Sequence, residues 1–329
     1  MKKKLLALIL ALMMLCVVFA SCNPTTEPDD GDTDPVEPQE QEEPYTKVVI
    51  LAGQSNLYGC SYFHYITPDI VGEERYERLT SGFENVKIVT QTLISSIDEF
   101  DTVHVGQITD YFGNALFGVE LGAAEALSAR YPDEEIYFIK VAYGGSTLGG
   151  NWQTPSKGQT DICYDVFKLI ADGALAALKD AGKNFKIVAM CWMQGESDAS
   201  DSSGLGWHYA YEKNLTTFIA DMRADFDDYA LGGTLNFVDA YISDSPHWTY
   251  YPIVNRAKLN VANSNEHNYI LNTLALDLVF PGVSGLTYNL EGLAGVDLMH
   301  YDSLSELTLG QMFGQQIIEI CEKSIVTNN

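Results

Sequence analysis

The sequence predicts an α/β protein in which a parallel sheet is covered by helices on both faces. Three runs rich in β-branched and other apolar residues, 46–53, 134–145 and 184–196, each contain or end near glycine. Amphipathic stretches lie between and after these runs. Short, continuously apolar strands are typical of sheets buried on both faces, and their alternation with helices requires crossover connections. Both observations therefore favour a central parallel sheet.

The predicted helices share apolar residues at i, i+3 and i+4. They are residues 118–131, 164–182 and 211–226, and a last helix from Ser303 to about Lys323. We expect the second helix to end at Gly182, because glycine readily adopts the left-handed conformation that follows many helices.

The alternation continues through residues 234–242, 255–265 and 269–274. Residues 95–113 are acidic and show neither a clear helical period nor a clear strand period. An insertion that faces the substrate is one interpretation of this segment, and the sequence does not decide it.

The first residues predict a secretory signal peptide, residues 1–21. Three lysines precede an apolar run from Leu5 to Ala20, which is shorter than the roughly 20 residues of a membrane-spanning helix. The run ends in "FASC", which resembles the lipobox of bacterial lipoproteins, where the cysteine, here Cys22, becomes the lipidated first residue. Cleavage by an ordinary signal peptidase after Ala20 or Ser21 is the alternative. We therefore expect an extracytoplasmic protein whose lipid at Cys22 anchors it to the bacterial cell membrane or cell surface.

Residues 22–44 predict a disordered tether, and residues 45–325 a single folded domain. The tether is rich in acids and prolines and has no aromatic residue, so it cannot bury enough apolar surface to offset its ordering entropy. The net charge of −26 repels phosphate backbones, which argues against a nucleic-acid partner.

The cysteines and histidines predict no metal site and no cofactor. Cysteines beyond the signal peptide and lipobox lack paired C-x-x-C spacing, and most histidines are scattered. Disulfides and apolar core thiols remain equal alternatives for these cysteines in an exported protein. The cysteines are Cys60, Cys163, Cys191 and Cys321, and the scattered histidines are His64, His104, His208, His247 and His267.

Polar residues gather where three predicted strands end. "GQSN" follows the first strand, "YGGSTLGGNW" the second and "MQGESD" the third. Ligands of open parallel sheets bind at the carboxyl ends of the strands, so these segments are expected to converge on one site.

Ser55 in the first segment is a candidate nucleophile, because a later segment supplies a base. A serine hydroxyl is a weak nucleophile at its free pKa and needs an adjacent general base. Asp297 and His300 lie three residues apart, just before the last predicted helix. The carboxylate can accept from one imidazole nitrogen and leave the other to take the serine proton. We therefore predict that Ser55, Asp297 and His300 are catalytic.

An oxyanion hole needs hydrogen-bond donors near the serine. The backbone N–H of Ser55, the N–H of Gly145 and the carboxamide of Gln194 are the candidates. Glu196 is expected to support the site from behind, by orienting Gln194 or a loop, by assisting the histidine or by accepting from a backbone N–H. Gln54 and Asn56, which flank Ser55, are assigned the same supporting role.

Together the blocks "LAGQSN", "GGSTLGGNW", "WMQGESD" and "DLMHYD" resemble those of SGNH-type esterases. Within these, the chain resembles the sialate O-acetylesterase and carbohydrate esterase family six (acetylxylan esterase) group from Lys47 to Lys323. The resemblance implies a three-layer α/β/α sandwich of the SGNH-hydrolase, flavodoxin-like type and metal-independent removal of acetyl groups from sugars. Leu57 stands where a lipase-type G-x-S-x-G elbow has its second glycine, which disfavours an ordinary lipase fold.

By position, the resemblance implies that Ser55 is the nucleophile, that Asp297 and His300 complete the triad, and that Gly145 and Gln194 join the oxyanion hole. The expected function is a serine esterase that deacetylates carbohydrate, such as acetylated sialic acid, xylan or another glycan, through an acetyl-enzyme intermediate. A non-catalytic, surface-tethered carbohydrate-binding protein and an esterase for non-sugar esters are the alternatives. Three tryptophans near polar loops suit either sugar rings or core packing: Trp152, Trp207 and Trp248.

Overall fold

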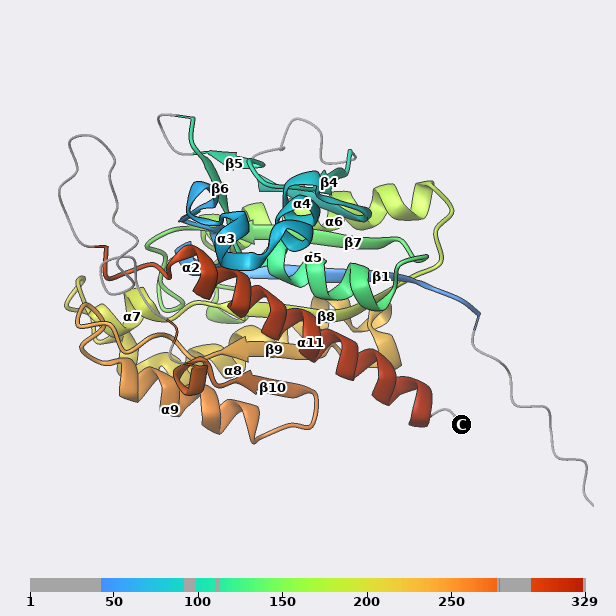
Figure 1. The fold of residues 1–329 in the computed structure, drawn as a ribbon. Coiled ribbons are helices and arrows are strands. Elements are labelled where there is room, and N and C mark those ends of the chain that lie inside the picture. The colour runs from blue at the N-terminus through green and yellow to red at the C-terminus, as the bar shows by residue number, and fades with distance from the viewer. Residues whose placement is uncertain (1–42, 92–98, 110–112, 277, 279–296, 328–329) are drawn as a thin grey trace, which may run out of the picture. The chain divides into compact units, whose positions relative to one another are not determined.

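A seven-stranded sheet forms the centre of the protein (Figure 1). The computed structural model describes residues 43–91, 99–109, 113–276, 278 and 297–327, and residues 44–329 form one compact unit. The strand order is β10-β9-β8-β1-β7-β3-β4, and every pair is parallel except β3 with β4. The strands are β1 (Thr46–Gly53), β3 (Phe83–Thr90), β4 (Asp101–Val103), β7 (Ile136–Ala142), β8 (Phe185–Met193), β9 (Phe237–Ala240) and β10 (Asn268–Leu271).

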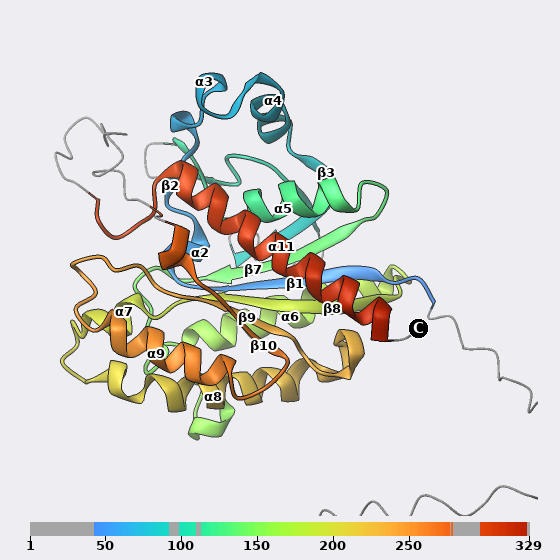
Figure 2. The same cartoon turned by 60° about the horizontal axis from the view of Figure 1, so that its bottom comes forward.

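Helices cover both faces of this sheet, which confirms the predicted three-layer α/β/α sandwich. Figures 1 and 2 show α5 and α11 on one face and α6, α8 and α9 on the other. The short helices α2 and α7 follow the carboxyl ends of β1 and β8. The α-helices are α2 (Ser55–Tyr58), α3 (Pro68–Val71), α4 (Glu73–Ser81), α5 (Val119–Arg130), α6 (Ile162–Asp180), α7 (Glu196–Ser200), α8 (Trp207–Phe226), α9 (Tyr251–Ala262) and α11 (Ser303–Thr327).

Most predicted elements lie within a few residues of their expected bounds, whereas one strand near the edge of the main sheet was missed. The helix predicted to stop at Gly182 ends at Asp180, and Gly182 has a φ of 70°. The missed strand is β3, whose residues alternate between buried and less buried positions at its start. Its charged and polar residues, Glu84, Asn85 and Lys87, interrupt the apolar run that would have identified it.

A second, three-stranded sheet lies in the region between β1 and α5. Its order is β2 (Ser61–Tyr62), β6 (Ala115–Phe117) and β5 (Ile108–Thr109), and its pairs are antiparallel. The undecided segment 95–113 thus contributes β4 to the main sheet and β5 to the small one, while parts of it lie outside the described residues. The antiparallel β4 is a correction to a purely parallel sheet.

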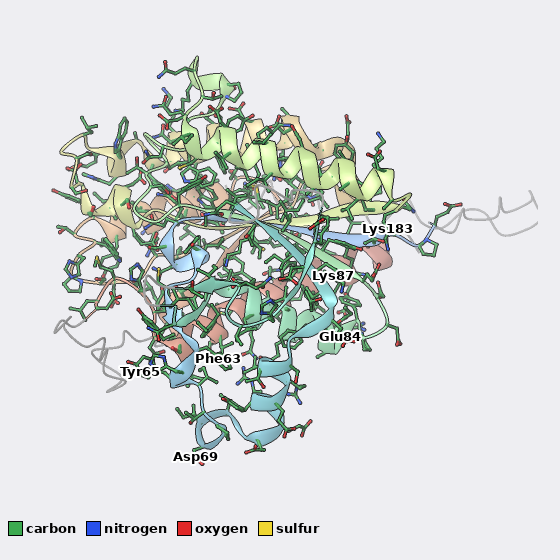
Figure 3. All side chains as sticks on the ribbon, turned by 90° about the horizontal axis from the view of Figure 1, so that it is seen from above. Phe63, Tyr65, Asp69, Glu84, Lys87 and Lys183 are labelled. Carbon is green, nitrogen blue, oxygen red and sulfur yellow. The ribbon has the colours of Figure 1, made fainter. Side chains whose placement is uncertain are left out.

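The chain makes an excursion away from the main sheet between β2 and β3. Figure 3 places Phe63 and Tyr65 nearer the sheet, and Asp69 of α3 at the far end of the excursion. The Phe63 ring stacks on Tyr76 of α4, with centroids 5.9 Å apart, and meets the Phe117 ring edge-on at 6.0 Å. These apolar contacts attach the excursion to the core.

Small residues allow α5 and α11 to pack closely. A Cβ atom built on Gly122 would lie 2.2 Å from the Leu307 carbonyl oxygen, and one on Gly310 would lie 2.3 Å from the Val119 carbonyl oxygen. Any larger residue at either position would force the helices apart. This packing fixes the start of α11, directly after the segment that carries His300.

The structure resolves one of the open alternatives and leaves others outside its range. Among the described residues the four cysteines form no disulfide, and Cys163, Cys191 and Cys321 are buried, as core thiols are. None of the helices in the described part of the chain is long and apolar enough to cross a membrane. The predicted signal peptide (residues 1–21), lipidated Cys22 and most of the tether (22–44) lie outside the described residues.

Candidate active site

The end of β1 is held tightly against the end of β8. Gly53 has a φ of 156°, and a Cβ atom there would lie 2.0 Å from the Met193 carbonyl oxygen. The next residue, Gln54, donates its N–H to the same oxygen at 2.8 Å. Only glycine permits this close approach, which directs the chain out of the sheet and into α2.

Ser55 is the first residue of α2, at the carboxyl edge of the sheet, and is partly exposed. The loop after β7 lies beside it, because a Cβ atom built on Gly144 would be 3.7 Å from the Ser55 Cβ. Gly145 follows with a φ of 71° and is also exposed. Two of the three converging segments therefore meet at the serine, as the sequence predicts.

Asp297 and His300 form the expected pair. Oδ2 of Asp297 lies 2.8 Å from Nδ1 of His300. Its other oxygen, Oδ1, accepts from the backbone N–H groups of Met299 at 2.8 Å and His300 at 3.2 Å. The carboxylate thus holds both the loop and the imidazole ring, which leaves the far side of the ring available for proton transfer.

Electrostatics couple this pair. Burial alone would raise the pKa of Asp297, but its hydrogen bond and charge interaction with His300 outweigh burial and lower that pKa. Burial likewise would lower the pKa of His300, whereas hydrogen bonds to Asp297 and Cys60 raise it to about 10. The ionised carboxylate therefore stabilises the protonated imidazole, which is the state that forms after a histidine takes a proton.

Asn56 joins the serine segment to the histidine segment, although 243 to 245 positions separate the partners in sequence. Its Nδ2 donates to the Met299 carbonyl at 3.2 Å, and its Oδ1 accepts from the Tyr301 N–H at 3.3 Å. These contacts hold the residues on either side of His300 against Asn56, the residue that follows Ser55. The described contacts of His300 include no hydrogen bond to the Ser55 hydroxyl, and the Cys60 thiol interacts electrostatically with the ring.

Glu196 supports Asn56 and does not contact Gln194. It is fully buried at the start of α7, where its Oε1 accepts from Asn56 Nδ2 at 2.8 Å. Its Oε2 is buried with no hydrogen-bond partner among the described residues, and burial raises the pKa of this carboxyl group. This contact with Asn56 was not among the supporting roles predicted for Glu196, and it positions the residue next to the candidate nucleophile.

Gln194 lies beneath the site, and its hydrogen bonds differ from those expected of an oxyanion donor. The side chain is 0% exposed, and Nε2 donates to Asp198 Oδ2 at 2.7 Å and to the Ser146 carbonyl at 2.9 Å. Its Oε1 accepts from the Tyr211 hydroxyl at 3.1 Å. Both amide protons thus point to buried acceptors, because the tight strand end places this residue inside the fold.

Gln54 and Asp198 complete this buried cluster. Gln54 Oε1 accepts from the N–H groups of Gly195 and Ser197, each at 3.3 Å. Asp198 accepts from the N–H groups of Leu148 at 2.9 Å and Gly149 at 3.2 Å. The cluster therefore fixes the loop that carries Gly144 and Gly145 to the segment after β8.

Sequence reasoning missed Asp198 and Cys60. Asp198 stands in the block "MQGESD", but only its buried contacts reveal that it holds the glycine-rich loop. Cys60 lies five residues after Ser55 and was considered only for disulfides, whereas its thiol contacts His300. The spacing from the serine was the available signal, since α2 is a single turn that returns the chain to the site.

The three tryptophans, which suit either sugar rings or core packing, differ in their surroundings. Trp152 and Trp248 are buried, and their Nε1 groups donate to Ser146 Oγ at 2.9 Å and Ser243 Oγ at 3.1 Å, as core residues do. Trp207 is partly exposed and packs on Gly149. Within the described part of the chain, no group of three or more His, Cys, Asp or Glu side chains could hold a metal ion.

Fold and site together define a class of α/β protein that places polar loops at the carboxyl ends of a mostly parallel sheet, where such folds bind their ligands. The family model described as carbohydrate esterase, sialic acid-specific acetylesterase, matches residues 45–319, so the chain belongs to this family and is a carbohydrate acetylesterase. This confirms the resemblance seen in the sequence blocks.

Solved structures show the same fold. A protein from Arabidopsis thaliana is 17% identical, with a TM-score of 0.58 over 84% of this chain and 99% of its own. NanS is 16% identical, with a TM-score of 0.56 over 85% of this chain and 98% of its own. At these identities the likeness concerns the fold. No curated protein sequence matches the chain.

Proposed function

We propose that the protein is a serine esterase that removes O-acetyl groups from carbohydrate through an acetyl-enzyme intermediate. The observation that carries this proposal is the pair of hydrogen bonds between Asn56, the residue after Ser55, and the backbone of Met299 and Tyr301. These bonds connect the serine segment to the segment that carries the Asp297–His300 pair. A serine, an imidazole and a carboxylate at the same strand edge are the groups that acyl transfer needs.

In the proposed acylation, the Ser55 oxygen attacks the acetyl carbonyl carbon while His300 takes the hydroxyl proton. Asp297 stabilises the resulting imidazolium through the 2.8 Å hydrogen bond at Nδ1. The N–H groups of Ser55 and Gly145 are the proposed donors to the tetrahedral oxyanion. When the intermediate collapses, the sugar oxygen leaves and accepts the proton from His300, and Ser55 carries the acetyl group.

Deacylation repeats these steps with water as the nucleophile. His300 takes one water proton while the water oxygen attacks the acetyl-enzyme, and then returns that proton to the Ser55 oxygen as acetic acid departs and ionises to acetate in the solvent. His300 interacts with Cys60, so the proposed mechanism requires Nε2 of the ring to turn toward the Ser55 hydroxyl. Catalytic hydrogen bonds often form only when substrate binds.

The proposed substrates are O-acetylated glycans, and O-acetylated sialic acid is the first to test because the family description names it. Acetylxylan and other acetylated polysaccharides complete the panel. Acetate release from each substrate measures specificity. Hydrolysis of simple aryl acetates with no release from any carbohydrate would favour an esterase for non-sugar esters.

Ser55→Ala tests the nucleophile. We expect kcat to fall by about 10⁶-fold, the loss typical of removing a catalytic serine, while the melting temperature stays unchanged. Mass spectrometry of the rapidly quenched wild type should show one acetyl group on the peptide that contains Ser55. Turnover close to wild type in the folded variant would remove Ser55 from the mechanism. A folded wild type that binds glycans but hydrolyses no ester would favour the carbohydrate-binding alternative.

We also propose that a lipid on Cys22 anchors the protein outside the cytoplasm. The lysines, the apolar run and "FASC" support this location. Cys22→Ser should move the protein from the membrane fraction to the soluble fraction, and mass spectrometry should find a diacylglyceryl group on the wild-type N-terminal peptide. An unmodified N-terminus at Ser21 or Cys22 would indicate an ordinary signal peptidase.

A further inference from the structure

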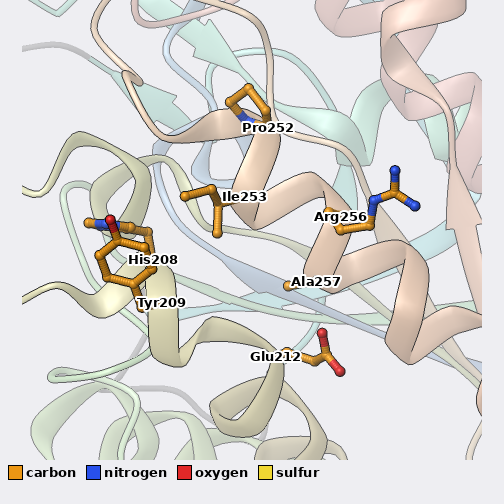
Figure 4. A pocket seen from close by; sticks show the side chains of 7 residues that line it. All are labelled: His208, Tyr209, Glu212, Pro252, Ile253, Arg256 and Ala257. Carbon is orange, nitrogen blue, oxygen red and sulfur yellow. The ribbon is translucent and has the colours of Figure 1, made fainter.

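A pocket of about 370 Å³ lies between the first turns of α8 and α9 (Figure 4). Its walls come from His208, Tyr209 and Glu212 of α8 and from Pro252, Ile253 and Arg256 of α9. This volume stands at the small end of the range for ligand-binding pockets. The pocket thus has room for one small ring and not for a long chain.

One wall of the pocket is an unusually exposed aromatic surface. Tyr209 is 75% exposed and Ile253 is 36% exposed, although both are large and largely apolar. The Tyr209 ring contacts the His208 ring at a centroid distance of 4.1 Å, and His208 stacks on Tyr250 at 3.7 Å and 4°. The rings support one another, so Tyr209 offers a platform without an apolar partner of its own on the solvent side.

Polar groups surround this platform. The Glu212 carboxylate accepts from Asn260 at 2.7 Å, and the exposed Arg256 makes no side-chain hydrogen bond or ion pair with the described residues. His208 is only 2% exposed, and both of its ring nitrogens are buried without a hydrogen-bond partner in the described chain. These nitrogens lie inside the protein, so the polar groups that remain open to a ligand are the Glu212 carboxylate and the Arg256 guanidinium.

The pocket lies on the same edge of the sheet as Ser55. Helices that follow parallel strands begin at the carboxyl edge, and α8 and α9 both do so (Figures 1 and 2). Backbone contacts tie the two places together: Tyr250 donates its N–H to the Ala199 carbonyl of α7 at 2.9 Å. Ser245 Oγ, in the loop before α9, donates to the Leu298 carbonyl at 2.6 Å, two residues from His300.

We propose that this pocket is an accessory sugar subsite, which binds a residue of the glycan other than the one whose acetyl group is removed. The inference rests on the proposed carbohydrate substrate. The apolar face of a pyranose ring packs on Tyr209 and Ile253, and its hydroxyl groups meet Glu212 and Arg256. Arg256 and Glu212 offset one another in charge, so the pocket suits a neutral sugar residue.

Direct binding tests the subsite without turnover. Ser55→Ala and the double variant Ser55→Ala/Tyr209→Ala are titrated by calorimetry with two probes, a xylotetraose carrying acetyl groups and an O-acetylated sialyllactose. We expect Tyr209→Ala to weaken binding of at least one probe by about 3- to 10-fold, the scale of a lost ring contact. Tyr209→Phe should preserve binding, because it keeps the ring.

Turnover provides the second measurement. In the wild-type background Tyr209→Ala should raise KM for the same oligosaccharide by a similar factor and leave kcat/KM for 4-nitrophenyl acetate unchanged. Leu169→Ala, which removes an exposed apolar residue of α6 that is 56% exposed, is the matched control and should change neither value.

Unchanged affinity for both probes in folded Tyr209→Ala and Ile253→Ala variants would overturn the subsite, even where acetate release continues. Conversely, a wild type that releases no acetate from carbohydrate, but whose probe binding depends on Tyr209, would support the subsite and reject the proposed reaction. The two failures are therefore distinguishable.

Discussion

The segment around His300 and the segment around Gln194 both bring polar side chains to the carboxyl edge of the sheet, yet their surroundings differ. The Asp297–His300 pair is partly exposed, and the ring keeps one side for proton transfer. Gln194 is fully buried and donates both amide protons to acceptors within the fold. The polar residues at these strand ends therefore form two groups. The Asp297–His300 pair keeps ring atoms open to solvent, whereas Gln194 uses both amide protons inside the fold.

This difference separates chemistry from support. A group whose donors and acceptors are all used inside the fold stabilises the loops around it but has nothing to offer a substrate. Asn56 and Glu196 lie between the two groups and connect them, because Asn56 contacts the residues on both sides of His300 while Glu196 belongs to the segment after β8. Substitutions in each group test this difference, because they should affect turnover and stability to different extents.

Among these substitutions, Asp297→Asn should have the largest effect on turnover. We expect kcat to fall by about 10⁴-fold, since the carboxylate fixes the orientation and charge of the ring. Because the pKa of His300 is raised above its ordinary 6.5, the base form exists only above the raised pKa, so wild-type kcat/KM should rise with pH through a midpoint above 6.5. The residual activity of Asp297→Asn should have its midpoint shifted toward 6.5. An unchanged midpoint would mean that Asp297 does not act through His300.

Asn56→Ala should reduce kcat by about 10²-fold, because it releases the backbone on both sides of His300 and small misplacements of catalytic groups are costly. KM should change little. It also removes the hydrogen bond to buried Glu196, so the free energy of unfolding should fall by about 1–3 kcal/mol. Glu196→Gln, which retains a side chain of similar size, is the variant with which the turnover and stability of Asn56→Ala are compared. Wild-type turnover in a destabilised Asn56→Ala variant would show that the hydrogen bonds of Asn56 serve stability alone.

Gln194→Ala should act mainly on stability. Removing the amide takes one donor from Asp198 and from the Ser146 carbonyl and one acceptor from the Tyr211 hydroxyl. Losing these buried hydrogen bonds should cost about 1–3 kcal/mol in the free energy of unfolding, while kcat changes only a few-fold. Tyr211→Phe removes one hydrogen bond of the same cluster and should cost about 1 kcal/mol. Urea unfolding and steady-state kinetics measure both. If turnover instead slowed by about 10²- to 10³-fold while stability stayed unchanged, Gln194 would be restored as an oxyanion donor.

Cys60→Ala should have the smallest effect. The interaction with Cys60 helps to raise the pKa of His300, so its loss should move the midpoint of kcat/KM to lower pH, by less than Asp297→Asn does. The maximal kcat should remain within a few-fold of wild type, because Cys60 takes no part in the proposed bond changes. Cys60→Ser, which keeps a hydrogen-bonding group, should retain most of the wild-type midpoint. A midpoint that is identical in all three proteins would rule out a role for Cys60 at the ring.

Much of the fold could be predicted because its elements carry strong periodic signals. The strands at the centre of the sheet are buried on both faces, and α5, α6 and α8 follow the predicted helices closely. The strand β3 lies between β7 and β4, and its charged residues weaken the apolar pattern. The antiparallel β4 is too short, at three residues, to show any period. Edge structure of this kind depends on partners distant in sequence.

The sequence by itself determined which chemistry is available: a serine after a strand, an Asp–x–x–His segment and four polar blocks in order. Spacing on the chain suffices there, because Asp297 and His300 meet through one short loop. Only the tertiary structure decided which polar side chains are buried and which stay open at the carboxyl edge of the sheet. Asn56 reaches residues 299 and 301, Gln194 turns inward, and Cys60 meets His300, all through contacts that depend on how β1, β8 and the start of α11 pack. Burial and hydrogen-bond saturation are properties of that packing, and no local pattern encodes them.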